Sequence, residues 1–169
     1  RDGKGVAQDY KKAMQSFRKA ADHGDADAQF SVGNMYCKGD GVAQDYKKAV
    51  QWSREAADRG LVEAQFNLGN RYIKGKGISQ DYNEAAQWYR KAADQGVVNA
   101  QLFLGHMYSD GKGVAQNLNE AVQWYSKAAD QGLANAQCIL GDIHSDGEGV
   151  VQNFKEAVRW YRKAADQGG

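Results

Sequence analysis

The sequence predicts an all-α protein, an α-solenoid of antiparallel helix pairs with about nine helices. Three observations predict this class: a pattern that recurs every 36 residues, the absence of proline, and 20 glycines, most of them at repeating positions. Proline normally makes up about 5% of a protein and interrupts helices, so its absence favours an almost wholly helical chain. A period of this length is typical of helix pairs that stack along a line.

Glycine and tryptophan positions define the repeat. The second glycine of each G-x-G motif is Gly5, Gly41, Gly77, Gly113 or Gly149, and the tryptophans Trp52, Trp88, Trp124 and Trp160 keep the same step. We therefore divide the chain into a partial repeat, 1–25, that supplies a second helix only, and four complete repeats, 26–61, 62–97, 98–133 and 134–169. Together they are expected to form one solenoid domain.

The first helix of each repeat precedes the G-x-G motif. In the repeat 62–97, Ala64, Leu68 and Tyr72 recur at the spacing of one helix face. A polar residue at the start is the expected N-cap, and three of the four are of a favoured type. These residues are Asp27, Glu63, Asn99 and Asn135.

The second helix follows the G-x-G motif. Its expected N-caps are Asp45, Asp81, Asn117 and Asn153, and Glu84, Glu120 and Glu156 stand three residues later, as in a capping box. Gly60, Gly96 and Gly132 follow the last turn, where a left-handed residue is expected. Glycines also stand in the middle of each first helix, at Gly33, Gly69, Gly105 and Gly141, at a cost of about 1 kcal/mol each relative to alanine. We expect them to mark close approach of the partner helix.

These motifs together resemble the Sel-one-like repeat (SLR) family, a relative of the tetratricopeptide repeat. The resemblance rests on A-x-A-Q-x-x-L-G-x-x-Y, G-x-G-V-x-Q-D and A-x-x-W-Y-x-K-A-A-x-Q-G, which residues 62–97 follow closely. It implies a right-handed superhelix whose first helices line a concave groove. It also implies a non-enzymatic adaptor or scaffold that binds a protein or peptide.

Composition excludes some other classes. The chain has 22 Lys and Arg against 21 Asp and Glu, a net charge of +1, which gives no reason to expect nucleic acid as a partner. No apolar run approaches the ~18 residues of a membrane span, so membrane insertion is not expected. Cys37 and Cys138 lie three repeats apart and are expected to be free thiols. They weakly favour a reducing compartment, but the sequence leaves the localisation unknown.

No motif for a cofactor, metal or catalytic group stands out. The stretch 109–117, SDGKGVAQN, resembles a phosphate loop, but its counterparts keep the glycines and not the lysine, so we interpret it as a structural turn. His106 and His144, with nearby aspartates, leave open a metal site, or a hydrolase or ligand-binding activity. The Trp-Tyr pairs are interpreted as core residues rather than a stacking platform for bases.

The expected partner-binding residues occupy the positions of the first helices that would line the groove. They vary between repeats where the packing positions stay constant. They are Phe30, Asn34, Lys38, Phe66, Asn70, Ile73, Lys74, Leu102, His106, Asp110, Asp142 and Asp146. An alternative for some of the apolar residues in this set is that they pack between neighbouring first helices.

The charges along these positions change from basic to acidic. Lys38 and Lys74 hold the same position as Asp110 and Asp146 in the later repeats. We expect a partner segment of the opposite charge polarity. An alternative is a purely structural spacer within a larger protein. The terminal repeats lack neighbours, so end-to-end self-association through these uncapped repeats is also an expectation.

Overall fold

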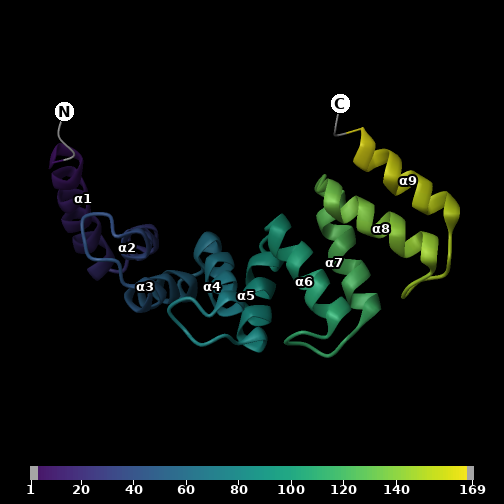
Figure 1. Cartoon of the computed structure of the whole chain (residues 1–169), viewed down its shortest axis with the longest axis horizontal. Coiled ribbons are helices and arrows are strands. Elements are labelled where there is room, and N and C mark those ends of the chain that lie inside the picture. Colours follow the sequence, from purple (N-terminus) through teal and green to yellow (C-terminus); the bar gives the residue numbers. More distant parts are fainter. Residues whose placement is uncertain (1–3, 167–169) are drawn as a thin grey trace. The chain divides into compact units, whose positions relative to one another are not determined.

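The computed structural model describes residues 4–166, and within them it contains nine helices and no strand, which confirms the all-α solenoid prediction (Figure 1). The helices are α1 (Lys4–Asp22), α2 (Ala26–Lys38), α3 (Tyr46–Asp58), α4 (Val62–Lys74), α5 (Tyr82–Asp94), α6 (Val98–Asp110), α7 (Leu118–Asp130), α8 (Ala134–Asp146) and α9 (Phe154–Ala165). None of these helices is long and apolar enough to cross a membrane.

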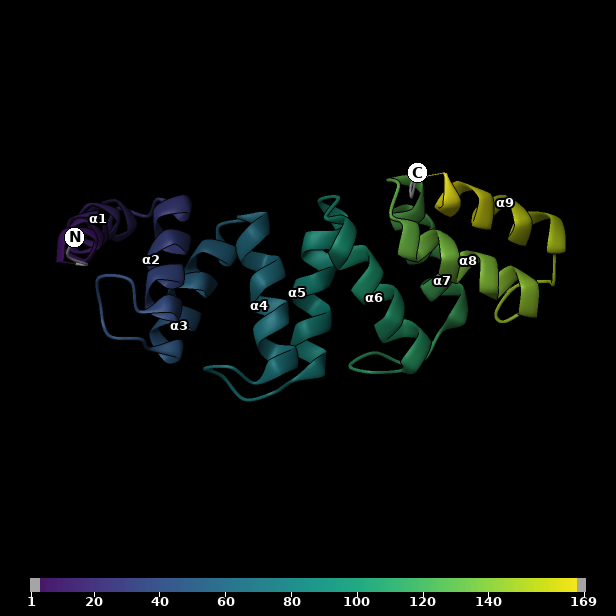
Figure 2. The same ribbon diagram turned by 45° about the horizontal axis from the view of Figure 1, so that its top comes forward.

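The two helices of one repeat pack against each other. The pairs α2–α3, α6–α7 and α8–α9 make extensive contacts, and Figure 2 shows α8 and α9 side by side. Each first helix ends at a glycine in the left-handed conformation, such as Gly39 at φ 84° and Gly111 at φ 69°. This glycine turns the chain into the loop that leads back along the first helix.

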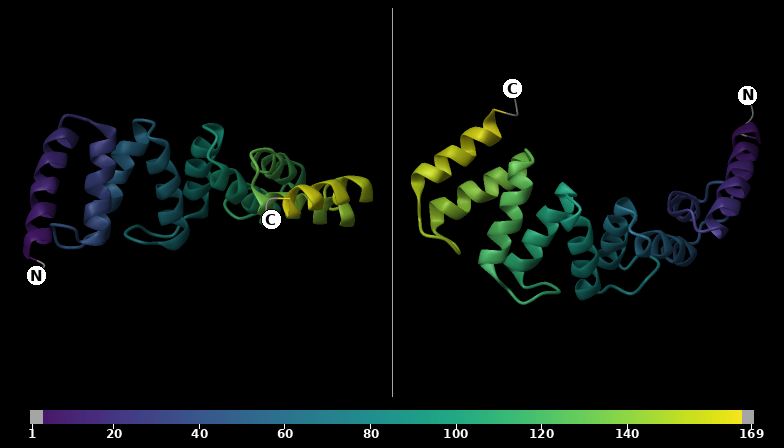
Figure 3. Two further views of the ribbon diagram at one scale, coloured as in Figure 1. Left: turned by 90° about the horizontal axis from the view of Figure 1, so that it is seen from above. Right: turned by 180° about the vertical axis from the view of Figure 1, so that it is seen from behind.

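The contacts divide the chain into two compact units, residues 1–88 and 89–169, with the boundary inside α5. The core of the first unit includes Val32, Tyr36 and Ala49. The core of the second is built around α7 and α8, which Figure 3 shows packed together, and includes Ala128 and Leu140. Each repeat of a solenoid contacts only its neighbours, so a solenoid does not need one common core. The single solenoid domain stays a prediction.

The N-caps of the second helices are confirmed. The Asp45 carboxylate accepts hydrogen bonds from the backbone N–H of Lys47 and Lys48, each at 3.0 Å, and Asn117 caps α7 in the same way. The second hydrogen bond of the capping box, from the backbone N–H of the cap residue to the glutamate three residues later, was predicted wrongly. The backbone N–H of each cap residue donates to the first helix instead, as from Asp45 to the Tyr36 carbonyl at 2.9 Å. The later glutamate is therefore not needed as an acceptor.

The predicted N-caps of the first helices are also wrong. The caps are Asp25, Leu61, Val97 and Leu133, so Asp27, Glu63, Asn99 and Asn135 each lie at the second helical position. Of the four caps, only Asp25 accepts a hydrogen bond with its side chain. The preceding turn determines the start, because the Leu61 N–H is bound to the Ala56 carbonyl at 3.1 Å and the helix begins directly after it.

A buried glutamine joins each repeat to the one before it. Gln101 is 4% exposed, and its side-chain amide donates to the Ala93 carbonyl at 3.1 Å, at the end of the preceding second helix. The equivalent bonds run from Gln29 to Ala21, from Gln65 to Ala57 and from Gln137 to Ala129. Each of these carbonyls also accepts the backbone N–H of the glycine three residues later, as Ala93 does from Gly96 at 3.0 Å, so the glutamine adds a second hydrogen bond at the helix end.

The mid-helix glycines do mark close approach. A Cβ atom built on Gly105 would lie 2.5 Å from Cε1 of Tyr125, and one on Gly141 would lie 2.5 Å from Cε1 of Tyr161. On Gly33 the nearest atom is Oγ of Ser53, at 3.0 Å. The second helix of each of these repeats therefore occupies the space that a side chain would need.

Candidate protein-binding face

The predicted partner-binding residues lie on α2, α4, α6 and α8. The lysines, the aspartates and His106 are exposed, and Phe30, Asn34, Phe66, Asn70 and Ile73 are half-buried. We call these residues, without Leu102, the first-helix face. It has a part in each unit, one on α2 and α4 and one on α6 and α8.

Leu102 does not belong to this face. Its side chain is 9% exposed and packs in the core of the second unit with Tyr125 and Leu140. The alternative that an apolar groove position packs between helices therefore applies to Leu102. A residue so buried has little surface left for a partner.

In the first unit, the face contains a small notch between α2 and α4. Its volume is about 130 Å³. Six residues line it, and we call it the basic notch: Cys37, Asn67, Asn70, Arg71, Lys74 and Lys76. The structure thus brings together the predicted residues Asn70 and Lys74 and adds Arg71, which sequence reasoning missed.

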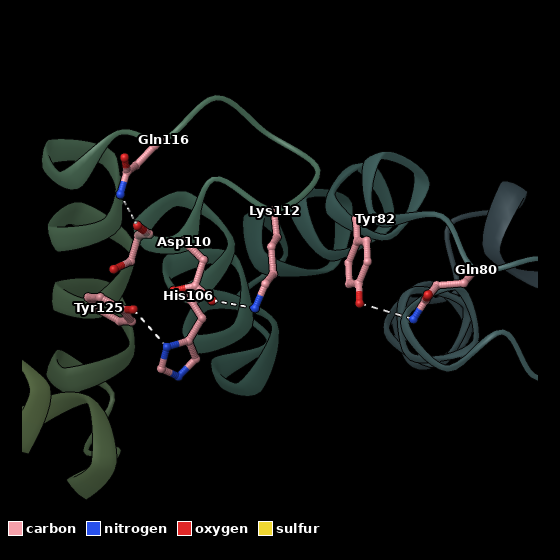
Figure 4. Close-up of polar contacts among 8 residues, drawn as sticks. Gln80, Tyr82, His106, Asp110, Lys112, Gln116 and Tyr125 are labelled. Carbon is pink, nitrogen blue, oxygen red and sulfur yellow. Dashed lines mark hydrogen bonds and ion pairs between the residues drawn. The ribbon is translucent and has the colours of Figure 1, made fainter.

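In the second unit, His106 lies against a tyrosine of the same repeat. The Tyr125 hydroxyl and Nδ1 of His106 are 3.0 Å apart, and the two rings meet edge to face at 5.4 Å (Figure 4). Burial raises the pKa of Tyr125 to about 12, so the phenol stays protonated and can donate. Desolvation lowers the pKa of His106, and the negative charge of Asp110 opposes part of this shift. The lowered pKa favours the neutral ring, whose Nδ1 can accept the hydrogen bond.

Asp142 on α8 repeats this arrangement one repeat later. The Tyr161 hydroxyl donates to the Asp142 carboxylate at 2.6 Å, and this bond, with nearby negative charge, raises the pKa of Tyr161 to about 12. The sequence analysis assigned these tyrosines to the core and missed that their hydroxyls reach the face. The shared 19-residue spacing between the face residue and the tyrosine is the signal that could have revealed it.

The stretch 109–117 is a turn. Figure 4 shows the Gln116 amide reaching back to the end of α6, where it donates to the Ser109 carbonyl at 2.8 Å. Gln44, Gln80 and Gln152 make the same bond in the other repeats. Lys112 pairs with Asp110 at 3.0 Å rather than pointing into a cradle. The structural interpretation of this stretch is confirmed.

The core interpretation of the Trp-Tyr pairs is confirmed for α5 and α7 and is wrong for Tyr161 on α9, which is 38% exposed. Trp88, Tyr89, Trp124 and Tyr125 are each at most 5% exposed, as the core interpretation requires. The guanidinium of Arg90 lies over the Trp124 ring at 5.6 Å and also bonds the Tyr108 hydroxyl. The Trp124 ring is therefore already covered by a cation of this chain, and with so little exposed surface neither indole is open for a base to stack on.

Metal and thiol chemistry receive little support. Across residues 4–166, no three His, Cys, Asp or Glu side chains gather in a way that could hold a metal ion. Both cysteines are free thiols, as expected. Cys37 lines the basic notch, and Cys138 is exposed on α8.

With the repeat packing described, comparison with known proteins places the chain among the α-solenoid repeat proteins. The family model for the Sel1 repeat matches residues 1–25, 26–61, 62–97, 98–133 and 134–169. The chain belongs to the Sel1 repeat family. Members of this family are generally non-catalytic scaffolds that bind other proteins. A comparison with curated protein sequences found no match.

Solved structures give the same assignment. A protective antigen of uropathogenic Escherichia coli strains with an SLR fold is 40% identical over 92% of this chain, with a TM-score of 0.85. A Sel1 repeat protein from Oxalobacter formigenes is 36% identical over 94% of the chain, with a TM-score of 0.87. Cysteine-rich protein B of Helicobacter pylori is 30% identical over 82% of this chain and the whole of its own length, with a TM-score of 0.62.

This chain spans only part of the first two structures. It covers 33% of the Escherichia coli antigen and 65% of the Oxalobacter formigenes protein. The similarity therefore concerns the repeats, and it does not carry over what the longer proteins do.

Proposed function

We propose that this chain is a protein-interaction adaptor or scaffold that binds a peptide or protein segment on the first-helix face. The observation that carries the proposal is the contrast between packing and face positions in the same helices. Ala64, Ala100 and Ala136 are fully buried and identical in the packing position. By contrast, Lys74 and Asp110 share one exposed position and carry opposite charges.

This contrast favours recognition over a purely structural role. Packing demands the same residue in each repeat, because each helix pair meets its neighbour in the same way. A position that contacts only a partner can hold a different residue in each repeat. A solenoid also offers its partner a long surface rather than a closed pocket.

The charge distribution suggests the polarity of the segment. The face is basic in the first unit, at Lys38 and Lys74, and acidic in the second, at Asp110, Asp142 and Asp146. Acidic residues of a partner would complement the part on α2 and α4, and basic residues would complement the part on α6 and α8.

The test compares charge reversals on and off the face. A partner identified by affinity purification with mass spectrometry is titrated against the wild type, Lys74→Glu and Asp110→Lys. Lys47→Glu is the control, because Lys47 is exposed on α3 and lies outside the face. We expect each face variant to weaken binding several-fold and the control to leave it unchanged. Unchanged binding in both face variants would refute the proposal.

A further inference from the structure

The basic notch in the first unit has the size of a subsite for one side chain. Its 130 Å³ is about four times the ~30 Å³ share of one water molecule in the liquid, and it is well below the ~300 Å³ of small-molecule pockets. A notch of this volume accommodates the head group of a partner side chain, with water, rather than a whole metabolite.

The lining of the notch carries positive charge only. Arg71, Lys74 and Lys76 line it without any acidic residue. The three cations take no part in the ion pairs between Lys48 and Asp45, Lys112 and Asp110, and Arg159 and Glu156. The Lys76 ammonium lies 4.3 Å from the centre of the Tyr46 ring, a contact that leaves its charge in place.

Repeat architecture does not account for these cations. The positions equivalent to Arg71 are Met35, Met107 and Ile143, which are apolar. The position of Lys74 holds an aspartate in α6 and α8, and α6 has no basic residue in its last turn. The helix dipole therefore does not require a cation here, although it favours one.

We propose that the basic notch binds the side-chain carboxylates of an acidic peptide segment, with Arg71 and Lys74 as the specificity-determining residues. This inference rests on the proposed function and names the chemistry of one end of the partner. The planar guanidinium of Arg71 suits a carboxylate, which it can bind through two parallel hydrogen bonds. The side chain of Asn67 adds a neutral polar group to the lining.

A peptide fits this site better than a nucleic acid. Nucleic-acid affinity comes from neutralising many phosphates along an extended basic surface. The notch has three cations, and exposed Glu63 on α4 and the chain's net charge of +1 provide no such surface.

The first experiment measures fluorescence anisotropy with the full chain. The probe is a fluorescein-labelled peptide with glutamate at alternate positions, and the neutral control peptide has glutamine at those positions. The variants Arg71→Met and Lys74→Asp introduce residues that the chain itself uses at the equivalent positions, so the fold should tolerate them. Lys47→Met and Lys47→Glu, on exposed Lys47, match their changes in charge.

We expect the glutamate peptide to bind more tightly than the glutamine peptide. Each notch variant should weaken it by about fivefold, the upper end for an exposed ion pair, and the double variant by at least about tenfold. The Lys47 variants should bind as the wild type does. Equal losses in the notch and Lys47 variants would show a non-specific charge effect and overturn the proposal, as would stronger binding of a single-stranded oligonucleotide.

The two cysteines provide a second readout. Cys37 lines the notch, whereas Cys138 is exposed on α8 in the second unit. Saturating glutamate peptide should slow alkylation of Cys37 by iodoacetamide and leave Cys138 unaffected, as followed by mass spectrometry of the digested protein. Unchanged alkylation of Cys37 would place the peptide elsewhere and refute the notch as its site.

The outcome separates this inference from the proposed function. If the natural partner is weakened by Asp110→Lys but not by Arg71→Met or Lys74→Asp, the chain is an adaptor and the notch is not its acidic subsite. If no face variant affects the partner, both proposals fail.

Discussion

Gly105 offers the sharpest test of how the helix pairs pack. Substitution with alanine suits the helical backbone and should contribute about 1 kcal/mol through helix propensity. The new Cβ, however, would lie 2.5 Å and 2.6 Å from two ring carbons of Tyr125, about 1 Å short of van der Waals contact. Tyr125 is 3% exposed and packs against Leu102 and Leu140, so its ring has little room to move.

The expected result is a net loss of stability. Overpacking of this kind costs about 1–3 kcal/mol, and the confined ring places Gly105→Ala near the upper end. After the gain in propensity, about 2 kcal/mol of destabilisation remains, or a fall in Tm of about 4–8 °C for a chain of this size.

The assay is thermal unfolding followed by circular dichroism at 222 nm, with Gly33→Ala as the comparison. The Cβ at Gly33 would be 3.0 Å from its nearest neighbour, the Ser53 Oγ, so the loss there should be smaller. A Gly105→Ala variant as stable as the wild type, or more stable, would refute the argument that close packing selects glycine.

Two further predictions concern polar contacts in the second unit. The pKa of His106 is lower in the folded chain than in the unfolded chain, because desolvation disfavours the charged ring. The unfolded state then binds the proton more readily, so the wild type should lose stability relative to His106→Asn as the pH falls through the unfolded pKa of about 6.5. If the free energies of unfolding in urea change equally with pH for the wild type and His106→Asn between pH 8 and pH 5, this prediction is wrong. Gln101→Leu removes one of the two donors to the Ala93 carbonyl, which keeps the Gly96 N–H, and it removes the acceptor of the Gln131 amide, so it should cost about 1 kcal/mol in urea unfolding. Gln123→Leu, on the exposed face of α7, is its control, and an equal effect of both changes would show that the buried bond contributes nothing.

Much of the fold could be predicted because its signals are local and recur. A cap such as Asp45, a left-handed glycine such as Gly132 and the mid-helix Gly105 each depend on the backbone within a few residues or on one partner helix. The predicted caps Glu63 and Asn99 failed because the turn before the helix determines its start. A backbone hydrogen bond there, from Leu61 to Ala56, takes precedence over side-chain preference.

The candidate face could be predicted only in outline. Helical period placed Asn70, Lys74 and His106 on the first helices, and all three keep exposed surface. It could not show that Leu102 is enclosed by α7 and α8, nor that Arg71 joins Lys74 in one notch with Cys37 of α2.

The sequence alone therefore determined the repeat, the two helices within it and the positions that are free to vary. These depend on chain-local periodicity and turn chemistry, which 36 residues suffice to specify. Only the tertiary structure decided which variable positions stay open and which polar groups meet, as Tyr125 meets His106. The physical reason is that burial and hydrogen bonding at the face depend on side chains from other helices. The periodicity of one helix carries no information about the distances to those side chains.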